Sequence, residues 1–122
     1  MAVEKKIREL QEKRKKVLLG GGEQAIEKQK AMGKRTARER IMALLDKNSF
    51  NEYDLFVEHD ARDFDMGNKS LPSDGVIIGS GTIYGAPVAV FAQDFTVAGG
   101  SLGLMHSRKI TKIMDHALKM RM

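Results

Sequence analysis

Residues 75–95, GVIIGSGTIYGAPVAVFAQDF, contain the pattern that decides the fold of this chain. Two runs rich in β-branched and apolar residues lie on either side of residues 84–87, YGAP, and this arrangement predicts a β-hairpin. Gly79 and Gly81 lie within the first run, where glycine indicates a bulge or the close approach of another backbone. The sequence therefore predicts two paired strands that begin near Gly75.

A glycine pair, Gly99-Gly100, separates the predicted hairpin from a run with helical periodicity. We expect Gly100 or Ser101 to cap this long helix. Its apolar stripe is expected to contain five residues: Ile110, Ile113, Met114, Ala117 and Leu118. Glycine lets backbone N–H groups approach a ligand oxygen, but close packing of a strand against a helix explains the pair equally well. We expect Asp94, at the end of the second strand, to cap the turn that follows.

Three helices are predicted in the N-terminal third. A charged helix with a thin apolar stripe ends at residues 20–22, GGG, and a second, short helix ends at Gly33. Thr36 and Glu39 have the spacing of a capping box, which begins a third helix. Ile41, Leu44 and Leu45 supply the side of this helix that we expect to be buried.

The net charge of +5 is divided unevenly along the chain. Residues 1–42 carry 13 Lys and Arg against 6 Asp and Glu, residues 43–74 carry 3 against 8, and residues 75–122 carry 5 against 2. We divide the chain into a basic helical arm (1–45), an acidic irregular connector (46–74) with a short strand or helix near residues 49–59, and the start of a β/α core (75–122). The basic arm suits nucleic acid, an acidic partner or a phosphorylated ligand, but a solvated helical face explains it equally well.

Several classes of site are disfavoured by composition. The chain has no Cys, so it has neither disulfides nor thiolates, and we expect a cytoplasmic location. The longest apolar run, Ala86–Ala92, is too short for membrane insertion. The three His residues lack metal-ligand spacing, so no metal is expected. No nucleic-acid motif accompanies the 6% aromatic content, so no nucleic acid is expected as a partner. Residues 98–103, AGGSLG, lack the Lys and Ser/Thr of the nucleotide phosphate loop.

Two long stretches carry a resemblance to a known family. Residues 20–56, GGGEQAIEKQKAMGKRTARERIMALLDKNSFNEYDLF, and residues 74–120 resemble the carboxyltransferase (β) subunit of biotin-dependent acyl-CoA carboxylases. Residues 63–76, DFDMGNKSLPSDGV, are most similar to the branch of propionyl-CoA carboxylase, methylmalonyl-CoA decarboxylase and transcarboxylase. The resemblance implies an α/β fold, namely the N-terminal part of a ClpP/crotonase-like carboxyltransferase domain, in which helices precede a β-hairpin and a long helix.

The resemblance also implies an activity. Members of this family move a carboxyl group between carboxybiotin and the α-carbon of an acyl-CoA, with biotin carried by a partner protein and no cofactor bound directly. They work with a biotin carboxylase or carrier subunit and assemble as hexamers, trimers of dimers. Their catalysis relies on backbone N–H groups in two oxyanion holes. We expect those loops beyond residue 122, so no catalytic residue is expected here and the 122-residue chain alone is predicted to be inactive.

Two sets of residues are candidates for binding the acyl-CoA. A basic cluster is chemically suited to the CoA phosphates, and the strand-to-helix junction is expected to line the CoA approach. The candidates are Lys34, Arg35, Arg38 and Arg40 in the cluster, and Phe95, Thr96, Gly99 and Gly100 in the junction.

Two alternatives stay open. Arg38 and Arg40 can instead pair with the acidic residues 52–65. The whole chain can also be a basic helical interaction module that assembles with partners and has no catalytic role. The sequence leaves open which acyl-CoA is used, and whether the reaction is carboxylation, transcarboxylation or decarboxylation.

Overall fold

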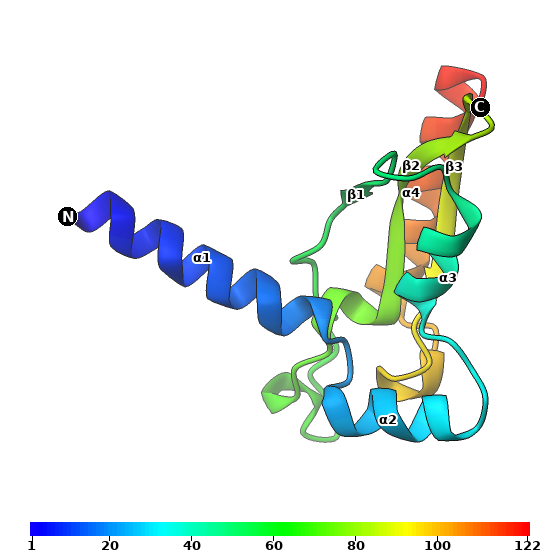
Figure 1. Cartoon of the computed structure of the whole chain (residues 1–122). Coiled ribbons are helices and arrows are strands. Elements are labelled where there is room, and N and C mark those ends of the chain that lie inside the picture. The colour runs from blue at the N-terminus through cyan, green and yellow to red at the C-terminus, as the bar shows by residue number, and fades with distance from the viewer.

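A computed structural model describes residues 1–122 as helices around a small antiparallel sheet (Figure 1). The regular elements are α1 (Ala2–Leu18), α2 (Glu23–Ala31), α3 (Ala37–Leu44), β1 (Asn51–Tyr53), β2 (Val76–Ile83), β3 (Ala86–Gln93) and α4 (Leu104–Met120). Short 3₁₀ turns occupy Met66–Asn68, Pro72–Gly75 and Ala98–Gly100. The predicted α/β order of helices, hairpin and long helix is confirmed.

The three strands form one antiparallel sheet in the order β1-β2-β3. The predicted hairpin is β2–β3, and its two-residue turn, Tyr84-Gly85, has positive φ at both positions (49° and 79°), as a type I′ turn requires. β1 lies in the acidic connector and pairs with β2, with Asn51 opposite Ser80. A Cβ on Gly79 would lie 2.2 Å from the carbonyl oxygen of Asn51, so close backbone approach, and not a bulge, explains this glycine.

The carboxylate of Asp46, just after α3, holds the hairpin turn. It accepts hydrogen bonds from the Thr82 hydroxyl (2.6 Å) and from the backbone N–H groups of Tyr84 (2.9 Å) and Gly85 (2.8 Å). The bond from Thr82, followed by those from the two backbone groups, lowers the pKa of Asp46. This long-range contact joins α3 to the sheet and was not predicted.

α3 covers one face of the sheet with an apolar cluster of Ala37, Ile41, Leu45 and Ile77. The half-buried side chains Phe50, Ile83, Val88, Val90 and Ala92 pack against it. The prediction that Leu44 is buried is wrong, because its side chain is 56% exposed. The buried stripe follows every fourth residue of this short helix, which leaves Leu44 beside the contact and not in it.

α4 covers the other face through Ile113, which packs against Val76 and Ile78 of β2 (Figure 1). Two residues of the predicted stripe, Met114 and Leu118, are 58% and 79% exposed. Their predicted burial is therefore wrong, whereas Ile110 and Ala117 are half-buried. The buried side of α4 instead includes His106 and Lys109, whose polar atoms all find partners.

The start of α4 also differs from the prediction. Its N-cap is Gly103, not Gly100 or Ser101. Gly99 and Gly100 have φ of +63° and +71° within the Ala98–Gly100 turn, and Ser101 is extended, so the helix cannot begin there. The left-handed backbone explains this glycine pair, because residues other than glycine adopt such φ values at a cost.

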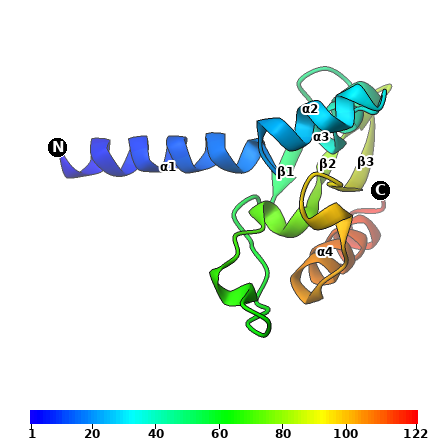
Figure 2. The ribbon, with the colours of Figure 1, turned by 90° about the horizontal axis from the view of Figure 1, so that it is seen from below.

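α1 projects away from the rest of the chain and buries none of its residues (Figures 1 and 2). Its apolar side chains Val3, Ile7 and Leu10 are 70%, 48% and 52% exposed. The helix ends before residues 20–22, as predicted, and Gly21 donates its backbone N–H to the Thr96 hydroxyl at 3.0 Å. No helix in the chain has the length and apolar character needed to cross a membrane.

Candidate functional site

A cleft lies between the end of α2, the start of α3 and the end of β3, and we call it the basic cleft. It is lined by Gln29, Gly33, Lys34, Arg35, Ala37, Arg40, Ala43, Gln93 and Phe95. The cleft brings together members of both predicted sets, three cations of the basic cluster and Phe95 of the junction, which are more than fifty residues apart in the sequence. Tertiary packing, and not local sequence, makes them neighbours.

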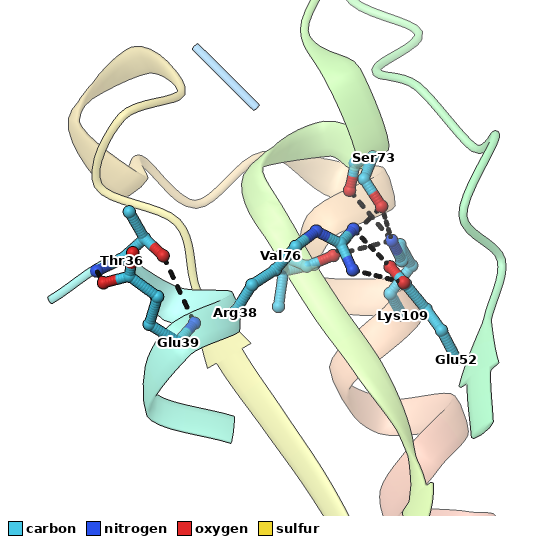
Figure 3. Close-up of polar contacts among 7 residues, drawn as sticks. All are labelled: Thr36, Arg38, Glu39, Glu52, Ser73, Val76 and Lys109. Carbon is cyan, nitrogen blue, oxygen red and sulfur yellow. Dashed lines mark hydrogen bonds and ion pairs between the residues drawn. The ribbon is translucent and has the colours of Figure 1, made fainter. Parts of the chain in front are cut away.

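The backbone on one wall of the basic cleft is set by local hydrogen bonds. The buried side-chain amide of Gln29 donates to the carbonyl oxygen of Arg35 at 2.7 Å, and the Gln29 carbonyl accepts from the N–H of Lys34. The predicted capping box then begins α3: Glu39 N–H donates to the Thr36 hydroxyl, and Thr36 N–H donates to the Glu39 carboxylate, both at 3.2 Å (Figure 3). The Gln29 bonds and the capping box together fix the backbone conformation of the loop between α2 and α3.

The cations of the basic cleft are free of carboxylates. Lys34, Arg35 and Arg40 are exposed and form no ion pair in the chain. Phe95 is 62% exposed, and the Lys34 ammonium lies 5.9 Å from the centre of its ring. Three unpaired cations beside an exposed aromatic ring suit a ligand that combines negative charge with a flat π-system.

Arg38 points elsewhere. Its guanidinium makes two hydrogen bonds to the Glu52 carboxylate of β1, at 2.5 and 2.9 Å, and both side chains are largely buried (Figure 3). The alternative that Arg38 pairs with the acidic residues 52–65 is therefore what the structure shows, while Arg40 makes no such pair. A role for Arg38 at CoA phosphates stays a prediction, and its geometry assigns the side chain to structural support.

Thr96, Gly99 and Gly100 do not line the basic cleft. The Thr96 hydroxyl donates to the Asp94 carboxylate at 2.6 Å and accepts from Gly21, so its only donor is used within the chain. Asp94 also accepts from the Thr96 N–H at 3.0 Å, which confirms its predicted role in the turn. Contact of these three residues with CoA stays a prediction.

A second group of polar residues, missed by sequence reasoning, lies buried between α4 and the Pro72–Gly75 turn. The Lys109 ammonium donates to the carbonyl oxygen of Ser73 (2.8 Å), the hydroxyl of Ser73 (2.8 Å) and the carbonyl oxygen of Val76 (2.7 Å) (Figure 3). Lys109 is only 2% exposed, and this burial lowers the pKa of its side chain to about 8. We call Ser73, Asp74, His106 and Lys109 the buried polar cluster.

The turn held by Lys109 is strained. Ser73 and Asp74 have φ of 55° and 47°, which is uncommon for residues other than glycine. The Asp74 carboxyl lies near the start of α4, where a Cβ on Gly103 would be 3.9 Å from Oδ2. Burial raises the pKa of Asp74, although a hydrogen bond from the backbone N–H of His106 opposes this rise.

His106 connects the buried polar cluster to the basic cleft. Its fully buried ring lies 2.7 Å (Nδ1) from the carbonyl oxygen of Asp74 and 3.2 Å (Nε2) from the side-chain nitrogen of Gln93. A carbonyl oxygen only accepts, so Nδ1 carries the proton and Nε2 accepts from Gln93. The sequence feature that could have predicted the burial of His106 and Lys109 is their spacing with Ile113, which places the three residues on one helix face.

No group of three His, Cys, Asp or Glu side chains in the chain is arranged to hold a metal ion. The cations of the basic cleft suit anionic groups of an organic ligand. Ser73, His106 and Lys109 of the buried polar cluster are hydrogen-bonded within the chain, and Asp74 Oδ2 is buried without a partner. The cluster is closed to solvent, so the basic cleft with its exposed cations is the candidate binding site.

Comparison with known proteins identifies the type of domain. A family model described as carboxyl transferase domain matches residues 28–122. The chain is 55% identical over 118 residues to methylmalonyl-CoA decarboxylase subunit alpha of Veillonella parvula, covering 97% of this chain and 23% of that protein. It is 52% identical over 111 residues to the mitochondrial propionyl-CoA carboxylase beta chain of Homo sapiens, covering 89% of this chain and 21% of that protein.

A solved structure has the same fold over this region. The transcarboxylase 12S structure, described as a hexamer assembly with methylmalonyl-coenzyme A and methylmalonic acid bound, superimposes with a TM-score of 0.92 at 46% identity. The match covers 93% of this chain and 22% of that one. The chain therefore spans between about a fifth and a quarter of the length of these relatives. The predicted crotonase-like carboxyltransferase fold and the predicted resemblance are confirmed.

Proposed function

The chain belongs to the carboxyl transferase domain family, and on this premise we propose that it helps to move a carboxyl group between carboxybiotin and the α-carbon of an acyl-CoA. The propionyl and methylmalonyl thioesters are the acyl-CoA substrates that we propose, because the relatives named above are called propionyl-CoA carboxylase and methylmalonyl-CoA decarboxylase. The chain forms part of an acyl-CoA carboxyltransferase domain, and the complete reaction is proposed for the complete protein.

Within that function, the basic cleft binds the nucleotide end of coenzyme A. The observation that carries this assignment is the cluster of unpaired Lys34, Arg35 and Arg40 beside the exposed ring of Phe95. Coenzyme A carries phosphates and an adenine ring, so it offers an anion to the cations and a π-system to the aromatic side chain.

Residues 1–122 bind coenzyme A in this proposal and do not carry out the carboxyl transfer. Oxyanion-hole loops are expected outside residues 1–122, so we expect the chain by itself to bind coenzyme A without turning over methylmalonyl-CoA. Release of CO₂ from methylmalonyl-CoA by the purified 122-residue chain would overturn this part of the proposal.

We also propose that the protein assembles as a homo-hexamer and works with a biotin carboxylase or biotin carrier subunit. α1 supports an assembly role because helices in proteins gain most of their stability by packing an amphipathic face, and this 17-residue helix buries none of its residues within the chain. The same helix fits the alternative of an interaction module without catalysis. Binding of coenzyme A separates the two, because an interaction module has no reason to bind it.

A matched pair of charge reversals tests the basic cleft. Titration calorimetry with coenzyme A is carried out on the wild type, on Lys34→Glu in the cleft and on Lys13→Glu on α1, two variants with the same change in net charge. A charge-assisted hydrogen bond contributes about 1.5–3 kcal/mol, so we expect Lys34→Glu to weaken binding by about 10- to 150-fold. Lys13→Glu should change binding less than about twofold. Equal weakening by both variants would contradict a specific site.

A further inference from the structure

Gln93 is the point at which the basic cleft meets the buried polar cluster. It is the last residue of β3, its side chain is exposed, and it lines the cleft two residues before Phe95. Its side-chain nitrogen contacts the fully buried His106, and its side-chain oxygen has no partner in the chain. One end of the amide is therefore held by the protein core, and the other is available to a ligand.

His106 determines which end of the Gln93 amide is available. Its Nδ1–H is committed to the carbonyl oxygen of Asp74, so Nε2 is an acceptor only. Rotating the amide by 180° would set the Gln93 oxygen against the lone pair of Nε2, with two acceptors facing each other. The imidazole therefore keeps the amide nitrogen inward, leaves Oε1 free, and leaves the second N–H of the amide unused.

We propose that Gln93, positioned by His106, selects adenine as the base of the nucleotide bound in the basic cleft. This inference rests on the proposed binding of coenzyme A at this cleft. An adenine that stacks on Phe95 presents its N6 amino group and a ring nitrogen along one edge. The Gln93 oxygen accepts from N6, and the free N–H donates to the ring nitrogen, which is the pairing that glutamine makes with adenine elsewhere.

Guanine does not satisfy the same amide. It has a carbonyl oxygen where adenine has the amino group, so two acceptors would face each other at Gln93 Oε1. Lys34, Arg35 and Arg40 bind phosphates whatever the base, so they contribute affinity without base selection. Recognition at the cleft is thus divided between cations for the phosphates and one amide for the base.

The test compares two nucleotides that differ only in the base. Titration calorimetry measures the binding of adenosine 3′,5′-bisphosphate and guanosine 3′,5′-bisphosphate to the wild type, to Gln93→Met and to Gln11→Met on the exposed α1. A bidentate pair with a base contributes about 1–3 kcal/mol of discrimination, which corresponds to an adenine preference of about 5- to 150-fold. We expect Gln93→Met to abolish the preference and Gln11→Met to keep it.

Two results would overturn the assignment of Gln93. They are equal affinity of the wild type for the two nucleotides, and a preference that survives in Gln93→Met with an unchanged circular dichroism spectrum. Arg40→Glu separates this failure from failure of the proposed cleft. If both nucleotides bind equally and Arg40→Glu weakens both by about tenfold or more, the cleft binds phosphates and only base selection is wrong. If neither nucleotide binds the wild type, the proposed binding of coenzyme A at this cleft fails, and base selection by Gln93 fails with it.

Discussion

The two faces of the sheet are held by different kinds of interaction. On the α3 face, Ala37, Ile41 and Ile77 make apolar contacts, which are not directional. On the α4 face, His106 and Lys109 are buried and are tied by hydrogen bonds to particular atoms of the Pro72–Gly75 turn. The α3 face mainly supplies stability, while the α4 face also determines where a strained turn and the end of β3 lie. The candidate nucleotide-binding residues Gln93 and Phe95 lie at that end.

The largest expected effect is on the apolar face. Ile77→Ala should lower the free energy of unfolding by about 3 kcal/mol, because it removes a nearly inaccessible side chain and leaves a cavity. Urea unfolding followed by circular dichroism measures this change. Leu44→Ala on the exposed side of α3 is the control, and we expect it to cost less than about 1 kcal/mol. Similar losses for the two variants would contradict the assignment of the buried face.

Lys109→Met tests the polar face. Methionine fills a similar volume, but it leaves the carbonyl oxygens of Ser73 and Val76 without their donor, and an unsatisfied buried acceptor costs about 1–3 kcal/mol. We expect a loss of about 2 kcal/mol in the free energy of unfolding and weaker adenine selection, since the turn supports His106. Lys119→Met, at an exposed lysine of α4 that forms no ion pair, is the control. A variant that is as stable as the wild type would show that the ammonium is not needed to hold the turn.

The same ammonium predicts a dependence on pH. Its pKa is about 8 in the folded chain and 10.5 in the unfolded chain, so the unfolded chain binds more protons between these values. The stability of the wild type should therefore rise relative to Lys109→Met as the pH increases from 8 to 10.5, with a slope of at most about 1.4 kcal/mol per pH unit. The difference should become constant only well below pH 8, where Lys109 is protonated in both the folded and the unfolded chain. Urea unfolding of both proteins at pH 7, 9 and 10 measures it, and a difference that falls as the pH rises would contradict the direction of the shift.

The smallest expected effect on the free energy of unfolding concerns Arg38, which is paired with Glu52, and it is compared with the effect of changing the unpaired Arg40. Arg38→Ala should lower the free energy of unfolding by about 1.5 kcal/mol, because it removes a largely buried pair with Glu52, and it should leave the affinity for coenzyme A within about twofold of the wild type. Arg40→Ala should leave the free energy of unfolding unchanged and weaken the binding of coenzyme A, since Arg40 is exposed and unpaired. Calorimetry with coenzyme A and urea unfolding on both variants separate the roles. Loss of affinity in Arg38→Ala with unchanged stability would assign Arg38 to the ligand.

Several features could be predicted because they depend on residues close together in the chain. The capping box joins Thr36 to Glu39, three residues away, and the hairpin follows from two β-rich runs on either side of residues 84–87, although its turn type was not predicted. The errors occurred where distant residues intervene. Leu118 has the helical spacing of a buried residue but is 79% exposed, because spacing alone does not determine which side of α4 faces the sheet.

The sequence by itself determined the family, the order of the elements and the chemical types of the candidate ligand-binding residues, because motifs and periodicity are local. Only the tertiary structure decided which cations are free. Arg38 is paired because β1 joins the sheet and brings Glu52 beside α3. Lys34, Arg35 and Arg40 instead line the same cleft as Phe95, which follows β3. It also decided that Lys109 and His106 lie inside, because their hydrogen-bonding partners in the Pro72–Gly75 turn are more than thirty residues away. A charged or polar side chain can be buried when such partners are present, and the folded chain supplies them.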